Sequence, residues 1–306
     1  MKKRLYFIAI VAIIALLAAI TLSIVQSSLA SQIKREIKNR AKEYGVEISD
    51  FKCYVNLLTG NIGFKNLTLK QKDNEFKIKR GHITFKLSDF LSNKSVKGIY
   101  IDKAEIKLKN FIPFSFPVMT KKPISIDEIE IKNLILEIGS SNGNNISDIN
   151  VFGSLKNIGT NKNTIFSINA SSNSSSMEIK GDFDFDDWKK RLTYQILGKD
   201  VSLGILNVLE EGFLPSGIKE QLLSLYLKDI LMVNLKGKMN ITGNGEINEA
   251  NIDSKLKFLV SELSCETENE RIKSLIKKIN SNGVLEINYK IYGTTSNPFL
   301  TYDINF

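Results

Sequence analysis

Apolar residues recur at every second position through much of the chain beyond residue 45. In the runs 233–241 and 285–291 the odd positions are mostly apolar, and the even positions carry Asn, Lys and Glu. A period of two places successive side chains on opposite faces of a β-strand. Clusters of Ser, Asn and Gly at 140–145 and 171–176 are typical of turns between strands. We therefore predict a mainly β body of about fourteen strands, spanning roughly 70 Å at about 4.8 Å per strand.

A second pattern, apolar-x-apolar-x-x-apolar-x-apolar, occurs at 62–69, 99–106 and 124–131. The last two copies share Ile-Asp-x-x-Glu-Ile, at 101–106 and 126–131, 25 residues apart. Because the middle of the pattern holds one extra residue, each strand must bulge or bend there to keep its apolar side chains together. Repetition every 25–37 residues predicts an extended architecture of stacked strands, with a closed β-sandwich as the alternative.

The N-terminus carries an uncharged apolar run at 5–25, preceded by Lys-Lys-Arg at 2–4. A helix of this length can cross a bilayer, and the basic flank favours a cytoplasmic N-terminus. A cleaved signal peptide is the alternative, because Ser-Leu-Ala at 28–30 is a small-x-small site. The run is longer than a usual signal-peptide core, so we expect an uncleaved transmembrane anchor at 1–26.

A helical period follows the apolar run. Residues at steps of four and three share one face, and Gly45 is a good stop signal. They are Leu29, Ile33, Ile37, Ala41 and Tyr44. We predict a juxtamembrane helix at 27–45 and a body at 46–306. A few short helices are expected within the body, at 272–279, at 216–229, at 201–211 and after Ser88.

The formal net charge of +9 is unevenly distributed. Residues 1–44 hold eight Lys or Arg and two Glu, so +6 of the +9 flanks the apolar run. Such a distribution favours attraction to membrane headgroups, because a nucleic-acid-binding groove needs basic residues spread along the body. We expect no nucleic-acid partner.

Chemistry-bearing residues are few. One histidine, His82, and two cysteines, Cys53 and Cys265, argue against zinc modules, disulfide scaffolds and His-ligated metal centres. Pairing of the cysteines stays open. Residues 139–143 fit G-x-S-x-G, but no helix signal and no histidine follow. Residues 182–187 resemble the start of a calcium loop without its Gly and Glu, which favours a carboxylate-bearing strand over weak calcium binding. We expect no enzyme, metal or cofactor.

Residues 37–109 resemble the N-terminal region of AsmA-like proteins, relatives of TamB and of the chorein-type lipid-transfer proteins. The resemblance lies in a helix that ends at 42–46, a G-x-I-x-F-x-N-L-x-L strand at 60–69, a short segment at 89–91 and a strand at 96–108. Further weak matches follow at 237–245, 292–294 and 297–299. Lys103-Ala104 replaces the family's usual proline, and the chain is short for the family.

The resemblance implies a single-pass inner-membrane protein with a periplasmic body. That body would form an extended, curved antiparallel sheet, an open groove that is apolar inside. It would handle phospholipid or support outer-membrane biogenesis, with membrane phospholipid and envelope proteins as partners. The groove candidates are Ile62, Phe64, Leu67, Leu69, Phe76, Ile78, Ile99, Ile101, Ile106, Leu108, Ile126, Ile129 and Ile131. A period of two does not distinguish a lipid-filled groove from a dry core, so an ordinary core is the alternative for all of them.

Two other functions compete. The chain is also similar in layout to the type II secretion N protein, an anchored structural component with a β-rich body, which would hold a stable partner and no lipid. An anchored hydrolase ranks last, because no nucleophile and base are paired in the sequence.

Overall fold

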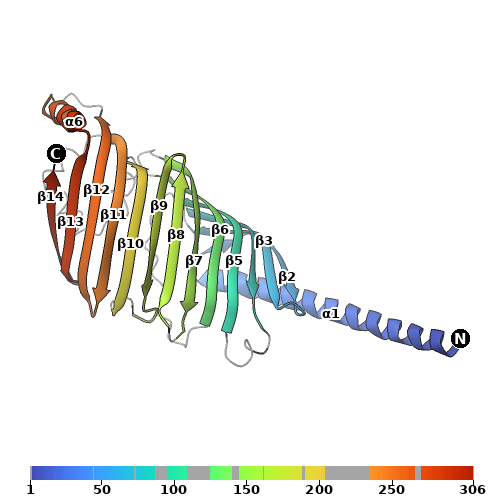
Figure 1. Ribbon diagram of the computed structural model, residues 1–306. Helices are drawn as coiled ribbons and strands as arrows, with labels where there is room; N and C mark the ends of the chain where they lie inside the picture. The colour runs from blue at the N-terminus through green and yellow to red at the C-terminus, as the bar shows by residue number, and fades with distance from the viewer. Residues whose placement is uncertain are drawn as a thin grey trace.

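The chain forms one long helix followed by a single open sheet (Figure 1). The computed structural model describes residues 2–43, 45–71, 74–86, 88, 95–108, 125–139, 145–160, 162–187, 190–203, 235–265 and 270–305. The helices in this part are α1 (Lys2–Glu43) and α6 (Glu270–Asn282). The strands are β1 (Glu47–Ile48), β2 (Lys52–Asn56), β3 (Asn61–Gln71), β4 (Asn74–Thr84), β5 (Ser95–Leu108), β6 (Ser125–Gly139), β7 (Asn145–Ile158), β8 (Thr164–Ser172), β9 (Ser175–Phe183), β10 (Arg191–Ser202), β11 (Leu235–Asn248), β12 (Asn251–Cys265), β13 (Leu285–Thr294) and β14 (Asn297–Asn305).

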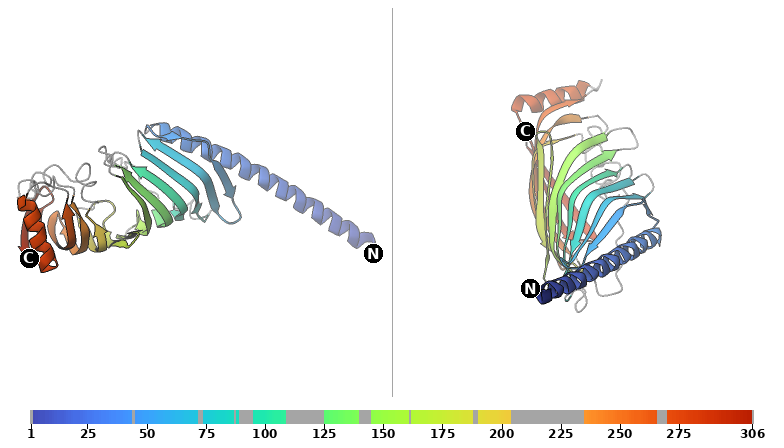
Figure 2. Two further views of the ribbon diagram at one scale, coloured as in Figure 1. Left: turned by 90° about the horizontal axis from the view of Figure 1, so that it is seen from above. Right: turned by 90° about the vertical axis from the view of Figure 1, so that its right-hand side faces the viewer.

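The sheet has fourteen strands, and from β3 to β14 each strand lies beside its neighbour in sequence. It is long and curved, and its curvature is clear in the view from above (Figure 2). The predicted mainly β, extended and open architecture is therefore confirmed. One pair departs from the predicted antiparallel arrangement, because β5 and β6 run parallel. Residues 109–124 separate these two strands, which is long enough for the crossover that parallel neighbours require.

Helix α1 is continuous from Lys2 to Glu43, where the sequence predicted an anchor and a separate helix. Gly45, which has φ +66°, follows the end of the helix. The Gly45 amide donates to the Lys42 carbonyl at 3.1 Å and the Val46 amide donates to the Ala41 carbonyl at 2.9 Å. A left-handed residue with these two bonds is a common helix C-cap and glycine adopts it without strain. The predicted stop at Gly45 is thus confirmed.

The predicted location is wrong. Within the part of the chain that the structure describes, no helix is long and apolar enough to cross a membrane. Spanning a bilayer takes about 20 consecutive apolar residues. The side chains of α1 are described from Ala18 onward, and the first charged residue in that part of the helix is Lys34. A single-pass inner-membrane protein with a periplasmic body is therefore not supported, nor is the transmembrane character of residues 1–26.

The bulge or bend expected from the repeat occurs in the first two copies. In β3, Asn66 has φ +57° and is skipped in the pairing with β4, while the register is the same on both sides of it, with Lys65 opposite Arg80 and Leu67 opposite Ile78. In β5 the pairing with β4 shifts between Ile101 and Ala104. A bulge of this kind adds one residue and keeps the flanking apolar side chains on one face.

The third copy is also irregular. The pairings of β6 with β5 and with β7 both skip Asp127, opposite Asn157 with φ +62°, and the register with β7 shifts between Ile131 and Leu134 and again between Leu136 and Ile138. The parallel pairing opposes Ile99 to Ile129, an offset of 30 residues where the shared Ile-Asp-x-x-Glu-Ile gave 25. The register of a strand is set by which apolar side chains must share one face. The shared Ile-Asp-x-x-Glu-Ile motif therefore did not give the register of β5 against β6.

Among the predicted short helices, only the one at 272–279 is confirmed, as α6. Gly283 follows its end with φ +92°. The helix predicted at 201–211 is wrong at its start, because Val201 and Ser202 belong to β10. The remainder of that segment, the helix at 216–229, the one after Ser88 and the loop residues 140–143 lie outside the described residues.

Candidate functional site

One face of the sheet is apolar from one end to the other. Residues that pair directly across neighbouring strands point to the same face, so the pairings trace rows of side chains across the sheet. One such row crosses β3 to β14 without a charged residue, and we call it the central row. It consists of Phe64, Gly81, Ile101, Ile131, Gly153, Ile168, Ile179, Ile196, Gly243, Leu256, Tyr289 and Tyr302.

Two flanking rows lie on the same face. One runs from Ile62 in β3 to Leu300 in β14, and the other runs from Leu67 to Ile304. Neither contains a charged residue, and only Tyr194 and Ser254 in the first carry hydroxyl groups. We call the surface made by these three rows the apolar face. Twelve strands at about 4.8 Å give it a length of roughly 50 Å.

The predicted groove candidates other than Ile126 lie on this side of the sheet. Ile126 pairs with Val96 and Ile158, which are 8% and 7% exposed. The pairings on both sides of β6 skip Asp127, and Asn157 opposite it has φ +62°, so the spacing of two residues from Glu128 does not assign Ile126 to the face of Glu128.

The sequence analysis missed the second half of the apolar face. Ile168, Ile179, Ile196 and Leu256 continue the central row, yet the candidate list stopped at Ile131. The signal that could have found them was present, because a period of two runs through 166–170, 177–183, 192–198 and 252–258.

At the β3 end the apolar face is a closed core. Phe51, Leu67, Ile78, Ala104 and Leu134 are buried there. Ile37 of α1, Ile48 of β1 and Cys53 of β2 pack against this cluster, together with the candidates Phe64, Leu69, Phe76, Ile101, Ile106 and Ile131. For this end the ordinary-core interpretation is correct.

A second covered region lies at the ends of β10 to β12. Val201, Leu203, Met239, Val260 and Leu263 are buried together with Ile279 of α6. Leu275 and Ile276 of α6 pack against the same cluster, so the predicted apolar stripe of this helix is its packing face.

Between these two covered regions the apolar face is accessible. Ile168, in the central row on β8, is 41% exposed. Within the described residues, α1 contacts β1 and β2, and α6 contacts β12, and neither makes comparable contact with β7 to β10. The middle of the face therefore offers apolar surface that a ligand can reach.

Aromatic rings lie over glycines on this face. A Cβ added to Gly81 would come within 2.5 Å of the Phe64 ring, and one added to Gly245 within 2.6 Å of the Tyr194 ring. Both pairs join neighbouring strands. Glycine at such a position leaves room for the aromatic ring of the neighbouring strand to lie over its backbone.

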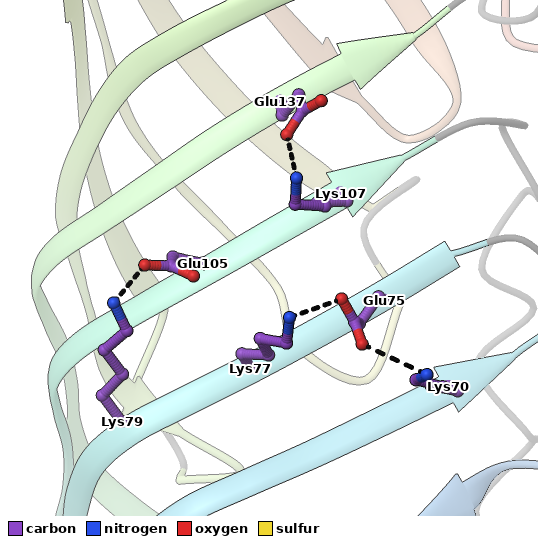
Figure 3. Close-up of polar contacts among 7 residues, drawn as sticks. All are labelled: Lys70, Glu75, Lys77, Lys79, Glu105, Lys107 and Glu137. Carbon is purple, nitrogen blue, oxygen red and sulfur yellow. Dashed lines mark hydrogen bonds and ion pairs between the residues drawn. The ribbon is translucent and has the colours of Figure 1, made fainter.

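The opposite face, which we call the polar face, carries ion pairs within a strand and between neighbouring strands (Figure 3). Glu75 on β4 lies 2.8 Å from Lys77 and 3.5 Å from Lys70. Lys79 pairs with Glu105, and Lys107 pairs with Glu137 at 2.6 Å. These contacts leave the polar face charged and hydrated.

The pKa values of these groups shift as expected for paired charges. The hydrogen bond from Lys77 lowers the pKa of Glu75, and the one from Lys79 lowers the pKa of Glu105. The hydrogen bond to Glu137 raises the pKa of Lys107. Every one of these shifts favours the charged form, so the face stays ionised at neutral pH.

A hollow of about 760 Å³ runs across β9 to β14. Most of its lining residues, such as Lys180, Gln195, Lys255 and Asn288, belong to the polar face. Residues of the central row also border it: Ile196, Gly243, Leu256, Tyr289 and Tyr302. Sites for apolar ligands are lined mainly by apolar side chains, so this hollow does not extend the apolar face.

The carboxylates of the calcium-loop-like segment form hydrogen bonds with nearby residues. Asp182 accepts hydrogen bonds from Asn163, Arg191 and Thr193, and Asp184 accepts from the amides of two following residues. Among the described residues, no three His, Cys, Asp or Glu side chains come together to hold a metal ion.

The remaining candidates for chemistry do not meet one another. Cys53 and Cys265 are both free, and burial raises the pKa of the Cys53 thiol. His82 stacks on Tyr100 with ring centroids 4.9 Å apart, and its Nδ1 lies 3.9 Å from Asp102. The apolar face is therefore the feature on which a function can be argued.

No family model, curated protein or solved structure matches this chain. The resemblance to AsmA-like proteins thus stays a prediction.

Proposed function

We propose that this chain is a lipid-handling protein of AsmA type, which binds phospholipid acyl chains along the apolar face. The observation that carries the proposal is the central row, which crosses twelve strands without a charged residue and is accessible at Ile168. In an envelope, such a protein would supply or move phospholipid in support of outer-membrane biogenesis.

The dimensions suit an acyl chain. Three rows two residues apart make a strip about 14 Å wide and roughly 50 Å long. An acyl chain laid along the rows would lose water from each methylene, which contributes about 0.8 kcal/mol. A sheet with one apolar face needs a cover, and bound lipid would provide it over β7 to β10.

The polar face supports the same arrangement from the other side. Its cross-strand pairs, such as Lys107 with Glu137 and Lys156 with Glu128, would lose hydration if lipid covered them. Lipid would therefore bind one face only, with the ion pairs remaining in water.

The test is native mass spectrometry with lipid extraction on the full chain. We expect phospholipid to co-purify in a fixed ratio and to be lost from Ile168→Asp and Ile179→Asp. The matched control is Ile165→Asp, three residues from Ile168 on the same strand, 49% exposed and paired with Asp182 on the polar face. It should retain the lipid.

Two outcomes would sink the proposal. One is a monodisperse protein without lipid, which favours the structural alternative, a type II secretion N-like component whose partner cross-linking would then identify. The other is equal loss of lipid from Ile168→Asp and Ile165→Asp, because binding would then not depend on the apolar face.

A further inference from the structure

Strand β14 lies at the outer edge of the sheet (Figure 1). Among the described residues it pairs with β13 alone. The outer edge of such a strand presents a row of backbone N–H and C=O groups that can pair with another strand.

This edge lacks the usual protection against pairing. Edge strands are commonly short, bulged, or marked by lysine or proline. β14 has nine residues and no Lys or Arg, and its pairing with β13 runs without a shift from Asn297 to Asn305. Pro298 stands at its start, which leaves 299–305 free of proline.

The residues of β14 are also self-complementary. Leu300, Tyr302 and Ile304 end the three rows of the apolar face, and Asp303 is the only charged residue of the strand. In an antiparallel pair of two copies, the symmetry axis decides which residues face each other. An axis at Asp303 would oppose two carboxylates, and an axis at Thr301 would oppose Asp303 to Phe299.

An axis at Tyr302 avoids both conflicts. It opposes Tyr302 to Tyr302 of the second copy, Leu300 to Ile304, and Thr301 to Asp303. Aliphatic and aromatic pairs then meet on the apolar face, and a hydroxyl meets the carboxylate on the polar face. Cross-strand pairs of these kinds are stabilising, whereas like charges directly opposed are not.

We propose that β14 pairs antiparallel with β14 of a second copy of this chain, about a two-fold axis at Tyr302. A two-fold axis perpendicular to the sheet leaves the apolar face of both copies on the same side. The central row would then continue from one copy into the other and double its length. This pairing does not depend on lipid binding, so its test is separate from that of the proposed function.

The first measurement is the mass of the full chain in solution by light scattering. We expect twice 34.4 kDa at micromolar concentrations. Tyr302→Lys should weaken the dimer by about tenfold or more, because it opposes two ammonium groups on the axis. Tyr302→Glu should do the same, and an equimolar mixture of the two variants should restore the dimer.

The matched control is Tyr54→Lys. Tyr54 is an exposed tyrosine on β2, at the opposite end of the sheet, and its substitution should leave the dimer intact. Far-UV circular dichroism checks that each variant keeps its strand content.

Disulfide trapping tests the register. In a Cys53→Ser, Cys265→Ser background, Tyr302→Cys should give a covalent dimer under mild oxidation. Asp303→Cys should not, because its diagonal Cβ separation of about 7–8 Å exceeds disulfide reach. A monomer at every concentration, or a dimer indifferent to both Tyr302 charge variants, would overturn the proposal.

Discussion

The two ends of the sheet differ in how their edges are covered. At the first end β3 is flanked by the two-residue β1 and the five-residue β2, and α1 packs against both. At the last end the nine-residue β14 has no described strand beyond it, and α6 lies back on β12. Short strands and a helix protect an edge, whereas a long unbulged strand invites pairing.

The same difference appears along the apolar face. Ala104, near the first end, is 0% exposed, and Ile168 in the middle is 41% exposed. Both lie in apolar rows with the same period of two. The alternation makes a face apolar, and the element that packs on it decides whether that face is core or surface.

The largest effect should come from truncating the covered end. Ile78→Ala should lower the free energy of unfolding by about 2–5 kcal/mol, because it leaves a cavity in a closed cluster. Ile168→Ala should cost less than about 1.5 kcal/mol, since its side chain is already partly hydrated. Urea unfolding with an unchanged m-value measures both. Equal losses would erase the distinction between core and surface.

The glycines under aromatic rings sharpen the comparison. A Cβ at Gly81 meets the Phe64 ring and, at 3.0 Å, the Tyr100 backbone carbonyl, whereas a Cβ at Gly245 meets only the Tyr194 ring. Phe64 packs against the covered cluster and has little room to move. Both alanine variants should destabilise by about 1–3 kcal/mol, with Gly81→Ala the larger. Thermal unfolding of the two variants shows which is the less stable. If Gly245→Ala were the less stable, the middle of the sheet would be packed at least as tightly as the covered end.

At the last end, Asn280 fixes α6 to the sheet. Its Nδ2 donates to the Leu263 carbonyl at 2.7 Å, and the Leu263 amide donates to its Oδ1 at 3.1 Å. Asn280→Ala should cost about 1–2 kcal/mol, because both backbone groups lose their partner. Ser281→Ala, which removes only an exposed bond to the Lys278 carbonyl, should stay within about 0.5 kcal/mol. Amide exchange confined to α6 would show that the helix is released locally.

The sequence predicted the class of the fold well because period-two alternation is a local signal. It also predicted the irregular points of β3 and β5, since a strand takes up an extra residue within an apolar pattern by a bulge or bend. It did not predict the parallel pairing of β5 with β6, which depends on where the chain returns after 109–124. Strand order depends on the whole sheet and cannot be inferred from a short stretch of sequence.

The candidate site was predicted in part for the same reason. Phe64 and Ile101 were correctly placed on one face, yet they lie in the covered cluster and are poor probes of ligand binding. Ile168 is an exposed position on this face. Alternation alone does not identify it, because the helices and strands that bury other parts of the face are far away in sequence.

The smallest expected effect concerns the link between α1 and the first strands. Lys34 and Lys38 hold the Asp50 carboxylate at 2.8 and 3.0 Å, and their hydrogen bonds lower its pKa to about 2. An unfolded Asp titrates near about 3.9, so the folded pKa is the lower of the two. The contact then stabilises the fold above about pH 4, and the stabilisation is lost as the pH falls through about 2.

Asp50 is largely exposed, so solvent and salt weaken the contact and the effect should be small. Amide exchange in α1 around Lys34 and Lys38 should quicken between pH 4 and pH 2 once the intrinsic pH dependence is removed. Asp50→Asn should show no such change, because it has no charge to lose. Raising the salt concentration should shift the Asp50 pKa back toward its ordinary value, as screening requires. If the wild type and Asp50→Asn respond alike, α1 is held at this end by the apolar cluster around Phe51 alone.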